Sequence, residues 1–255
     1  MKNMKYKFTD ETKVVDNVTL HRIECVTAFG DVECGEKGGW IESEKNLSQS
    51  GNAWVCENAT VSGNARISGN AMVGGNAMVS DNATVSGNAM VGGNAMVSDN
   101  ATVSGNAIVY GDATVENATV SENAMVSDNA TVSGNARISG NAMVGGNAMV
   151  CDNATVSGNA IVYGDAMVSD NAKVSGNATV CGNAMVCENA DYIVFKNWWS
   201  SGRYFTWTRS NNKWNVGCFF GSGEELIKKA YKDSEKSGRE YERVVKYVND
   251  ILKEE

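Results

Sequence analysis

The sequence predicts an all-β protein built as a parallel β-helix, preceded by a β cap and followed by a small α+β domain. A six-residue word, (Gly/Asp/Glu)-Asn-Ala-x-(Val/Ile)-(Ser/Gly/Cys), repeats about two dozen times between residues 51 and 190. Nearly every word carries an aliphatic residue, which distinguishes the repeat from a disordered polar tract. The flanking segments do not repeat. We therefore expect a cap over residues 1–50, a coil over residues 51–190 and a C-terminal module over residues 191–255.

Each position of the word has a structural role. Alternate side chains of a strand point to the same side, so Ala and Val face the interior and the residue between them faces out. Gly-Asn supplies the corner, since glycine adopts positive φ freely and asparagine tolerates the left-handed region. A bend of the same sense every six residues produces a coil.

The spacing of the alanines reveals a duplication. Alanine recurs every six residues from Ala53 to Ala113, once after five at Ala118, and then every six to Ala190. The segment ATVSGNARISGNAMVGGNAMV begins at Ala59 and again at Ala130, one residue short of twelve words. We expect the five-residue word to advance the coil by one side like any other word.

The pattern (Ile/Val)-x-Gly-Asn-Ala-x, as in Val61–Arg66, resembles the left-handed β-helix of the hexapeptide-repeat superfamily, which includes trimeric acyltransferases. The resemblance covers residues 51–190 and implies triangular coils with three words per turn, or about eight coils. The order HRIE, FGD, GGWIE, NLS, GNAWV and the C-terminal stretch from Asn197 resemble uncharacterised phage and prophage hexapeptide-repeat proteins of Firmicutes. That second resemblance implies no established activity.

With three words per turn, every third outward residue falls on the same face. Two faces are then apolar and rich in methionine, and the third is polar, with threonines interrupted by Arg66, Arg137 and Lys173. Exposed apolar faces usually mark interfaces, and methionine packs well against irregular partners. We expect a homo-oligomer, a trimer as in the relatives, formed through Met72, Met78, Met90, Met96, Met125, Met143, Met149, Met167 and Met185. A flat threonine array of the kind that binds ice is an alternative use of the third face.

Charge and composition narrow the partners and the location. The chain has a net charge of -8, and the repeat block alone has three bases against eleven carboxylates, so we expect it to repel nucleic acid. There is no apolar run long enough for a membrane span. The charged first residues predict no secretory signal, and seven cysteines without a signal predict reduced thiols in the cytoplasm of a bacterial host.

Acyl transfer is the enzymatic alternative. Acyltransferases of the superfamily use a histidine on the coil as general base, whereas the single histidine here, His21, precedes the repeats. The cysteines of the repeat block, Cys56, Cys151, Cys181 and Cys187, show no metal-ligand spacing. We expect no catalytic residue, no metal and no cofactor.

The C-terminal module should begin with a hairpin of strands at Tyr204–Thr208 and Lys213–Phe219. Ser222 should cap a helix that Ser237-Gly238 interrupts, and a second helix should carry an apolar face from Tyr241 to Leu252. Aromatic residues alternate with bases here, a composition that suits stacked bases, nucleotides or phosphates. The candidate ligand-binding residues are Trp198, Trp199, Arg203, Tyr204, Trp207, Arg209, Lys213 and Trp214. The same aromatics could instead form the core of a small domain.

These observations favour a non-catalytic structural and binding protein, encoded by a phage or prophage, whose β-helix self-associates and whose C-terminal module recognises a host protein or another molecule. Two alternatives remain open at this stage: a phage protein that sequesters a nucleotide-like ligand, and a hexapeptide-repeat acyltransferase.

Overall fold

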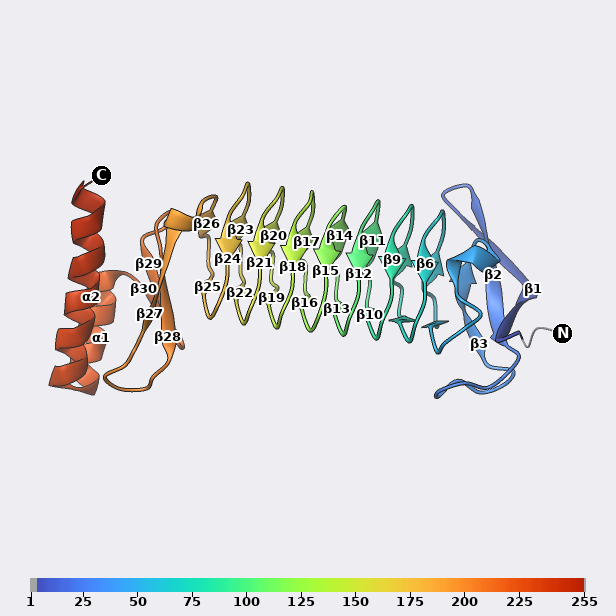
Figure 1. Ribbon diagram of the computed structural model, residues 1–255, viewed down its shortest axis with the longest axis horizontal. Helices are drawn as coiled ribbons and strands as arrows, with labels where there is room; N and C mark the ends of the chain where they lie inside the picture. Colours follow the sequence, from blue (N-terminus) through green and yellow to red (C-terminus); the bar gives the residue numbers. More distant parts are fainter. Residues whose placement is uncertain (1–3, 255) are drawn as a thin grey trace.

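The computed structural model describes residues 4–254 as a three-sided parallel β-solenoid of about eight turns, with a β cap at one end and a small α+β domain at the other (Figure 1). The two ends of the chain lie at opposite ends of the solenoid (Figure 1). The sequence prediction of a parallel coil with a C-terminal α+β domain is confirmed. The stacked turns place every third word on the same side of the solenoid.

Each side of the solenoid is one parallel sheet, named here after its first solenoid strand. The β4 face consists of β4 (Trp54–Val55), β7 (Met72–Val73), β10 (Met90–Val91), β13 (Ile108–Val109), β16 (Met125–Val126), β19 (Met143–Val144), β22 (Ile161–Val162) and β25 (Thr179–Val180). The β5 face consists of β5 (Thr60–Val61), β8 (Met78–Val79), β11 (Met96–Ser98), β14 (Thr114–Glu116), β17 (Thr131–Val132), β20 (Met149–Val150), β23 (Met167–Val168) and β26 (Met185–Val186). The β6 face consists of β6 (Arg66–Ile67), β9 (Thr84–Val85), β12 (Thr102–Val103), β15 (Thr119–Val120), β18 (Arg137–Ile138), β21 (Thr155–Val156) and β24 (Lys173–Val174).

The five-residue word does not disturb the register. Thr102 pairs with Thr119, and Ile108 pairs with Met125, so the sides remain aligned across the missing residue. The predicted assignment of outward residues to three faces is therefore confirmed.

The interior is filled by the alanine and the branched residue of each word. From Ala53 to Val186 these side chains are at most 3% exposed. Burying one such branched side chain contributes about 1.5–3 kcal/mol, and the repeat provides one in nearly every word. The core is thus a continuous column along the solenoid rather than a central cluster.

The corner differs in detail from the prediction. The left-handed φ belongs to the first residue of the word, as at Gly69 (φ 71°) or Asp81 (φ 58°), and in the solenoid an asparagine adopts it only at Asn117 in the five-residue word. The asparagines instead form ladders along the corners. Asn70 donates its side-chain amide to Asn88 at 3.0 Å, and Asn88 donates to Asn106 at 2.9 Å. Asparagine therefore links neighbouring turns rather than supplying the bend.

The N-terminal cap consists of β1 (Tyr6–Val15), β2 (Val18–Cys25), β3 (Lys37–Ile41) and η1 (Glu44–Asn46). A cap was expected over residues 1–50 from the sequence, but strand β1, which pairs antiparallel with β2, was not identified. Strand β3 joins this hairpin to β5, so the cap extends the β5 face. A Cβ at Gly39 would come within 2.7 Å of the Ala59 carbonyl oxygen, which shows how closely β3 covers the first turn.

In each word, the N–H groups of the outward residue, of the last residue and of the corner asparagine donate to carbonyls of the following turn, for example Trp54 to Ala71 at 2.9 Å. The first turn is therefore left with free carbonyls and the last with free N–H groups. The cap supplies donors: Lys5 Nζ donates to the Ala53 carbonyl at 2.7 Å, and Asn46 Nδ2 donates to the Ala65 carbonyl at 2.9 Å.

The C-terminal end supplies acceptors. Thr206 Oγ1 accepts from the Thr179 N–H at 2.9 Å, and Ser210 Oγ accepts from the Met185 N–H at 2.7 Å. The two ends of the solenoid are thus matched chemically to the groups that each end exposes.

The C-terminal domain has more strands than predicted. After η2 (Asn189–Asp191), an antiparallel sheet forms from β27 (Tyr192–Lys196), β28 (Tyr204–Thr208), β29 (Lys213–Val216) and β30 (Phe219–Gly221). The predicted strand ending at Phe219 is wrong in its extent. It ends at Val216 because Gly217 adopts φ 61° and turns the chain back into β30.

Two helices pack on this sheet: α1 (Gly223–Asp233) and α2 (Glu235–Glu254). Ser222 caps α1 as predicted, since its hydroxyl accepts from the Glu225 N–H. The predicted break at Ser237-Gly238 is wrong, because the chain becomes extended at Ser234 and Gly238 lies inside α2. A Cβ at Gly238 would clash with the Tyr231 ring, so this glycine allows the two helices to approach.

Candidate interaction surfaces

The β4 face exposes a row of methionine and isoleucine side chains. Met72, Met90 and Met143 are 47%, 48% and 46% exposed, and Ile108, Met125 and Ile161 are partly exposed between them. Trp54 at one end of the row is buried beneath the cap. The predicted interface residues of this face therefore lie in one line with side chains open to a partner.

A second outward row on the β4 face comes from the last residue of each word, where most other words have serine. From the first turn to the last it reads Cys56, Gly74, Gly92, Tyr110, Ser127, Gly145, Tyr163 and Cys181. Tyr110 and Tyr163 are 59% and 53% exposed. An open apolar hollow of about 180 Å³ lies at Gly74 and Gly92 and is bordered by Met72, Met90 and Tyr110.

Each tyrosine of this row leans toward the glycine of the preceding turn. A Cβ at Gly92 would come within 3.0 Å of the Tyr110 ring, and one at Gly145 within 3.2 Å of the Tyr163 ring. These glycines and tyrosines were not identified as candidate residues from the sequence. The signal was present in the segments GGNA and VYGD, whose first Gly or whose Tyr stands where most words end in serine.

The β5 face carries the other predicted methionines. Met78, Met149 and Met185 are 36%, 40% and 48% exposed, whereas Met96 and Met167 are half-buried. The β1–β2 hairpin lies against part of this face, where Val15 and Leu20 border a 210 Å³ hollow together with Met78 and Met96. One end of the β5 face is therefore covered within the chain itself.

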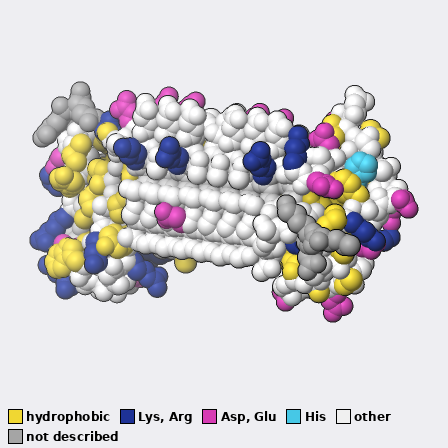
Figure 2. All heavy atoms as spheres, turned by 45° about the vertical axis from the view of Figure 1, so that its right-hand side comes forward, with side chains coloured by type: hydrophobic (Ala, Val, Ile, Leu, Met, Phe, Trp, Pro, Cys, Tyr) yellow, Lys and Arg dark blue, Asp and Glu magenta, His cyan; other side chains and the backbone are white. Residues whose placement is uncertain are grey.

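The face seen in Figure 2 shows parallel rows of uncharged polar groups and backbone along the solenoid, with Lys and Arg side chains spaced in a line near its upper edge and Asp and Glu side chains along that edge. Hydrophobic and charged side chains gather at the two ends of the molecule (Figure 2). On this face of the molecule, the exposed hydrophobic surface is therefore concentrated at the ends.

The C-terminal aromatic residues divide into two groups. Trp199, Trp207 and Trp214 are 9%, 1% and 1% exposed and form the core of the domain. Trp198 and Tyr204 are 69% and 44% exposed. The structure therefore separates the predicted ligand-binding set into buried residues that support the domain and surface residues that remain available.

Bases accompany the exposed aromatic residues. Lys196 Nζ lies 5.5 Å from the Tyr204 ring centre, and Arg203 is adjacent to Tyr204 and exposed. Lys213 lies on β29 beside Thr208, and Arg209 at the end of β28 donates its backbone N–H to Asp191. The available aromatic and cationic groups are thus centred on Trp198, Arg203 and Tyr204.

The groups that could perform acid–base or nucleophilic chemistry are scattered. His21 lies on β2 in the cap, with its ring stacked on Phe8 at 4.8 Å. Burial raises the pKa values of the Cys56 and Cys181 thiols, and burial together with Asp152 raises the pKa of Cys151 to about 11. A raised pKa keeps a thiol protonated and weakens it as a nucleophile or metal ligand.

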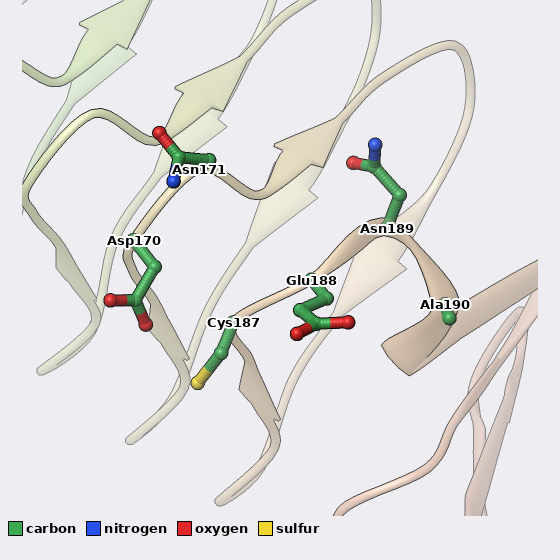
Figure 3. Close-up of a pocket in the computed structure, with 6 residues that line it drawn as sticks. All are labelled: Asp170, Asn171, Cys187, Glu188, Asn189 and Ala190. Carbon is green, nitrogen blue, oxygen red and sulfur yellow. The ribbon is translucent and has the colours of Figure 1, made fainter.

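A shallow acidic hollow lies at the end of the β5 face, next to η2. Asp170, Asn171, Cys187, Glu188, Asn189 and Ala190 line it, and its volume is about 780 Å³. Figure 3 shows Asp170, Cys187 and Glu188 turned to one side and Asn171 and Asn189 to the other. Within residues 4–254 no three His, Cys, Asp or Glu side chains are grouped so as to hold a metal ion. In the same residues no helix is long and apolar enough to cross a membrane.

The geometry defines a capped, three-sided β-solenoid with exposed apolar rows. Comparison with known proteins agrees with the repeat: residues 65–87, 77–93, 95–111, 136–151 and 148–164 match the family model of the YdcK Beta solenoid repeat. The chain is also 32% identical over 65 residues to a protein of Escherichia coli (strain K12) described as "Uncharacterized acetyltransferase YdcK". The match covers 22% of this chain and spans only 20% of the length of that relative. The similarity supports a β-solenoid repeat.

Proposed function

We propose that this chain is a non-catalytic structural and binding protein whose solenoid associates with copies of itself. The observation that carries the proposal is the β4 face, where exposed Met72, Met90 and Met143 lie beside a second outward row that contains glycines and tyrosines. Apolar surface of this extent is uncommon on monomeric proteins and usually marks an interface. The family resemblance implies a trimer.

The test compares the molar mass of the chain in solution with that of a variant in which Met72, Met90 and Met143 are all replaced by threonine. Threonine already occupies this row at Thr179, so the turns should still form. The control replaces Thr84, Thr102 and Thr155 of the β6 face by serine. We expect an oligomer for the parent chain and the control and a monomer for the methionine variant. A monomeric parent chain would overturn the proposal.

The C-terminal domain is proposed to present the recognition surface, centred on Trp198, Arg203 and Tyr204. Exposed aromatic faces beside bases suit stacking on a nucleotide-like or otherwise anionic partner, including an acidic patch of a host protein. The resemblance of both ends to phage and prophage proteins supports the cytoplasm of a bacterial host as its place of action. Replacing Trp198 and Tyr204 by alanine should abolish capture of that partner without changing the molar mass.

Acyl transfer remains the second candidate because the E. coli relative is described as an acetyltransferase. It would require acyl-CoA to bind at a seam between copies. Titration of the oligomer with acetyl-CoA in a calorimeter is the direct measurement. Saturable binding would favour the enzyme, and no heat of binding would favour the structural protein.

A further inference from the structure

The three faces differ in what is left to cover them. Part of the β5 face lies under the β1–β2 hairpin, and its second outward row is mostly serine. The β6 face carries threonines and bases, and its second row is serine throughout. The β4 face alone combines a first row that is apolar from Trp54 to Ile161 with a second row that has a single serine, Ser127. A partner that excludes water is therefore expected on the β4 face.

The second row of the β4 face alternates between large and small side chains in a way that is complementary to itself. Numbering the turns from β4 to β25 as one to eight, the tyrosines occupy turns four and seven. The small residues Gly74 and Ser127 occupy turns two and five. If the row is reversed end to end, both tyrosines fall on these small residues.

We infer that the partner of the β4 face is a second copy of this chain, packed antiparallel about a two-fold axis between turns four and five. This inference rests on the self-association proposed above and specifies its geometry as a pair. Each turn n then faces turn 9 − n of the partner, so the backbone position of Tyr163 lies opposite Gly74 and that of Tyr110 opposite Ser127. An interface related by a two-fold axis uses the same patch on both copies, as this pattern requires.

The first row is compatible with the same arrangement. Met72 faces Ile161, Met90 faces Met143, and Ile108 faces Met125 next to the axis. Glycines face each other at Gly92 and Gly145, and because the Tyr110 and Tyr163 rings lean over these glycines, one ring from each copy packs in the space between the two turns. No polar side chain of this row faces an apolar one except at the two ends of the face.

Charges at the edge of the β4 face also agree with the antiparallel arrangement. Each carboxylate of that edge meets a glycine or an asparagine of the partner instead of another carboxylate. The opposed positions are Glu57 with Gly182, Asp128 with Gly111, Asp112 with Asn129, and Asp165 with Asn76.

The ends of the two chains are complementary as well. The antiparallel arrangement places the cap of one copy beside the C-terminal domain of the other. Residues 1–50 contain seven bases and nine acids, and residues 191–255 contain twelve bases and ten acids. A net negative cap therefore meets a net positive domain at both ends.

The cap buries Trp54, and the C-terminal sheet contacts Thr179 and Cys181, so turns two to seven are the part of the β4 face that is open to a partner. Six strands spaced by about 4.8 Å, with one side of a turn about 15 Å wide, give about 430 Å² per copy, or about 860 Å² in total. Contacts between the cap of one copy and the C-terminal domain of the other must supply the rest of the roughly 1,200 Å² at which specific interfaces begin.

Cysteine cross-linking tests the arrangement. The background chain carries serine in place of the cysteines that are exposed or lie on the β4 face, namely Cys34, Cys56, Cys181 and Cys218. Into it, Met90→Cys and Met143→Cys are introduced separately. In the antiparallel pair, position 90 faces position 143 of the partner. The two copies of position 90 lie about 14 Å apart along the length of the solenoid, which is too far for a disulfide. Mild oxidation of a mixture of the two variants should give a covalent dimer, whereas each variant alone should not.

The outcomes separate the two proposals. A monomer by molar mass would overturn self-association itself. An oligomer in which the Met90→Cys variant cross-links with itself would show a parallel arrangement, such as a trimer, and would overturn only the antiparallel pair. An oligomer that gives no cross-link in the mixture would also overturn it.

A second variant probes the fit of the tyrosine. In the same background, in which Cys56→Ser shortens the side chain that a Cβ at Gly74 would meet at 2.9 Å, Gly74→Leu adds bulk opposite Tyr163 and should weaken dimerisation at least tenfold, while Ser86→Leu at the equivalent position of the β6 face should leave it unchanged. Equal dissociation constants for the two variants would contradict the fit.

Discussion

Gly176 and Gly182 occupy the same place in neighbouring words and have nearly the same backbone conformation, with φ 68° and 66°. Their surroundings differ. A Cβ at Gly176 would meet nothing within 4 Å, whereas one at Gly182 would lie 2.6 Å from the Phe220 ring of the C-terminal domain. The pair separates the cost of the backbone conformation from the cost of a lost contact.

We predict that Gly176→Ala lowers the free energy of unfolding by about 1–2 kcal/mol through the left-handed backbone alone. Gly182→Ala should cost more, by up to about 1 kcal/mol, because the partly exposed Phe220 ring must move. Thermal unfolding followed by tryptophan fluorescence measures both. Equal losses in the two variants would contradict the packing of Phe220 on the last turn.

Lys5 is the residue at which pH should act on the cap. Burial lowers its pKa to about 8, although its ammonium group donates to the carbonyls of Gly51 and Ala53 and lies 4.9 Å from the Phe29 ring centre. Between pH 8 and the ordinary Lys pKa near 10.5, the unfolded chain binds a proton that the folded chain does not. Stability therefore rises with pH in this window.

The expected slope attributable to Lys5 is at most about 1.4 kcal/mol per pH unit. Urea unfolding of the parent chain and of Lys5→Met at pH 7.5, 8.5 and 9.5 isolates it, because the methionine variant lacks this proton. If the two proteins gain or lose stability in parallel over that range, Lys5 does not titrate as described.

At the scale of elements, the last turn depends on side chains of the C-terminal sheet for its hydrogen bonds. Thr206 is 1% exposed, and its hydroxyl accepts from the Thr179 N–H. We predict that Thr206→Val, which keeps the shape but removes the acceptor, costs about 1–3 kcal/mol. Thr206→Ser retains the acceptor and should cost less. Hydrogen exchange of the Thr179 amide reports the same bond, and unchanged protection in the valine variant would argue against it.

The solenoid could be predicted from the sequence because each word repeats the same local information. Inward Ala and Val, outward x residues and the effect of the five-residue word at Ala118 all follow from the period. The ends do not repeat, so their contacts depend on residues distant in the chain. Strand β1 was not identified, and the break at Ser234 was displaced to Gly238, which serves instead in packing against Tyr231.

The candidate surfaces were predicted in part. The period placed the methionines on two faces but gave no sign that the β1–β2 hairpin lies against part of the β5 face, beside Met78 and Met96. The aromatic residues of the C-terminal domain were all candidates in the sequence, since composition does not reveal burial. The fold divides them into a core around Trp207 and Trp214 and an exposed group around Trp198.

At the scale of the whole molecule, the two ends keep the solenoid from extending by adding further strands, because donors cap one end and acceptors the other. We therefore propose that association is directed to the sides, and the β4 face is the side that is apolar in both rows. The molecule is a rod closed at its ends and open along one side, which suits a scaffold that presents its terminal domains.

The central claim is that the chain is a self-associating protein without a catalytic site. Native mass spectrometry of the intact chain, under gentle and then denaturing conditions, tests this claim most directly. We predict an oligomer whose mass is a whole multiple of the chain mass with nothing added, and an even multiple if copies pair through the β4 face. A monomer, or an oligomer that carries stoichiometric acyl-CoA, would contradict the account.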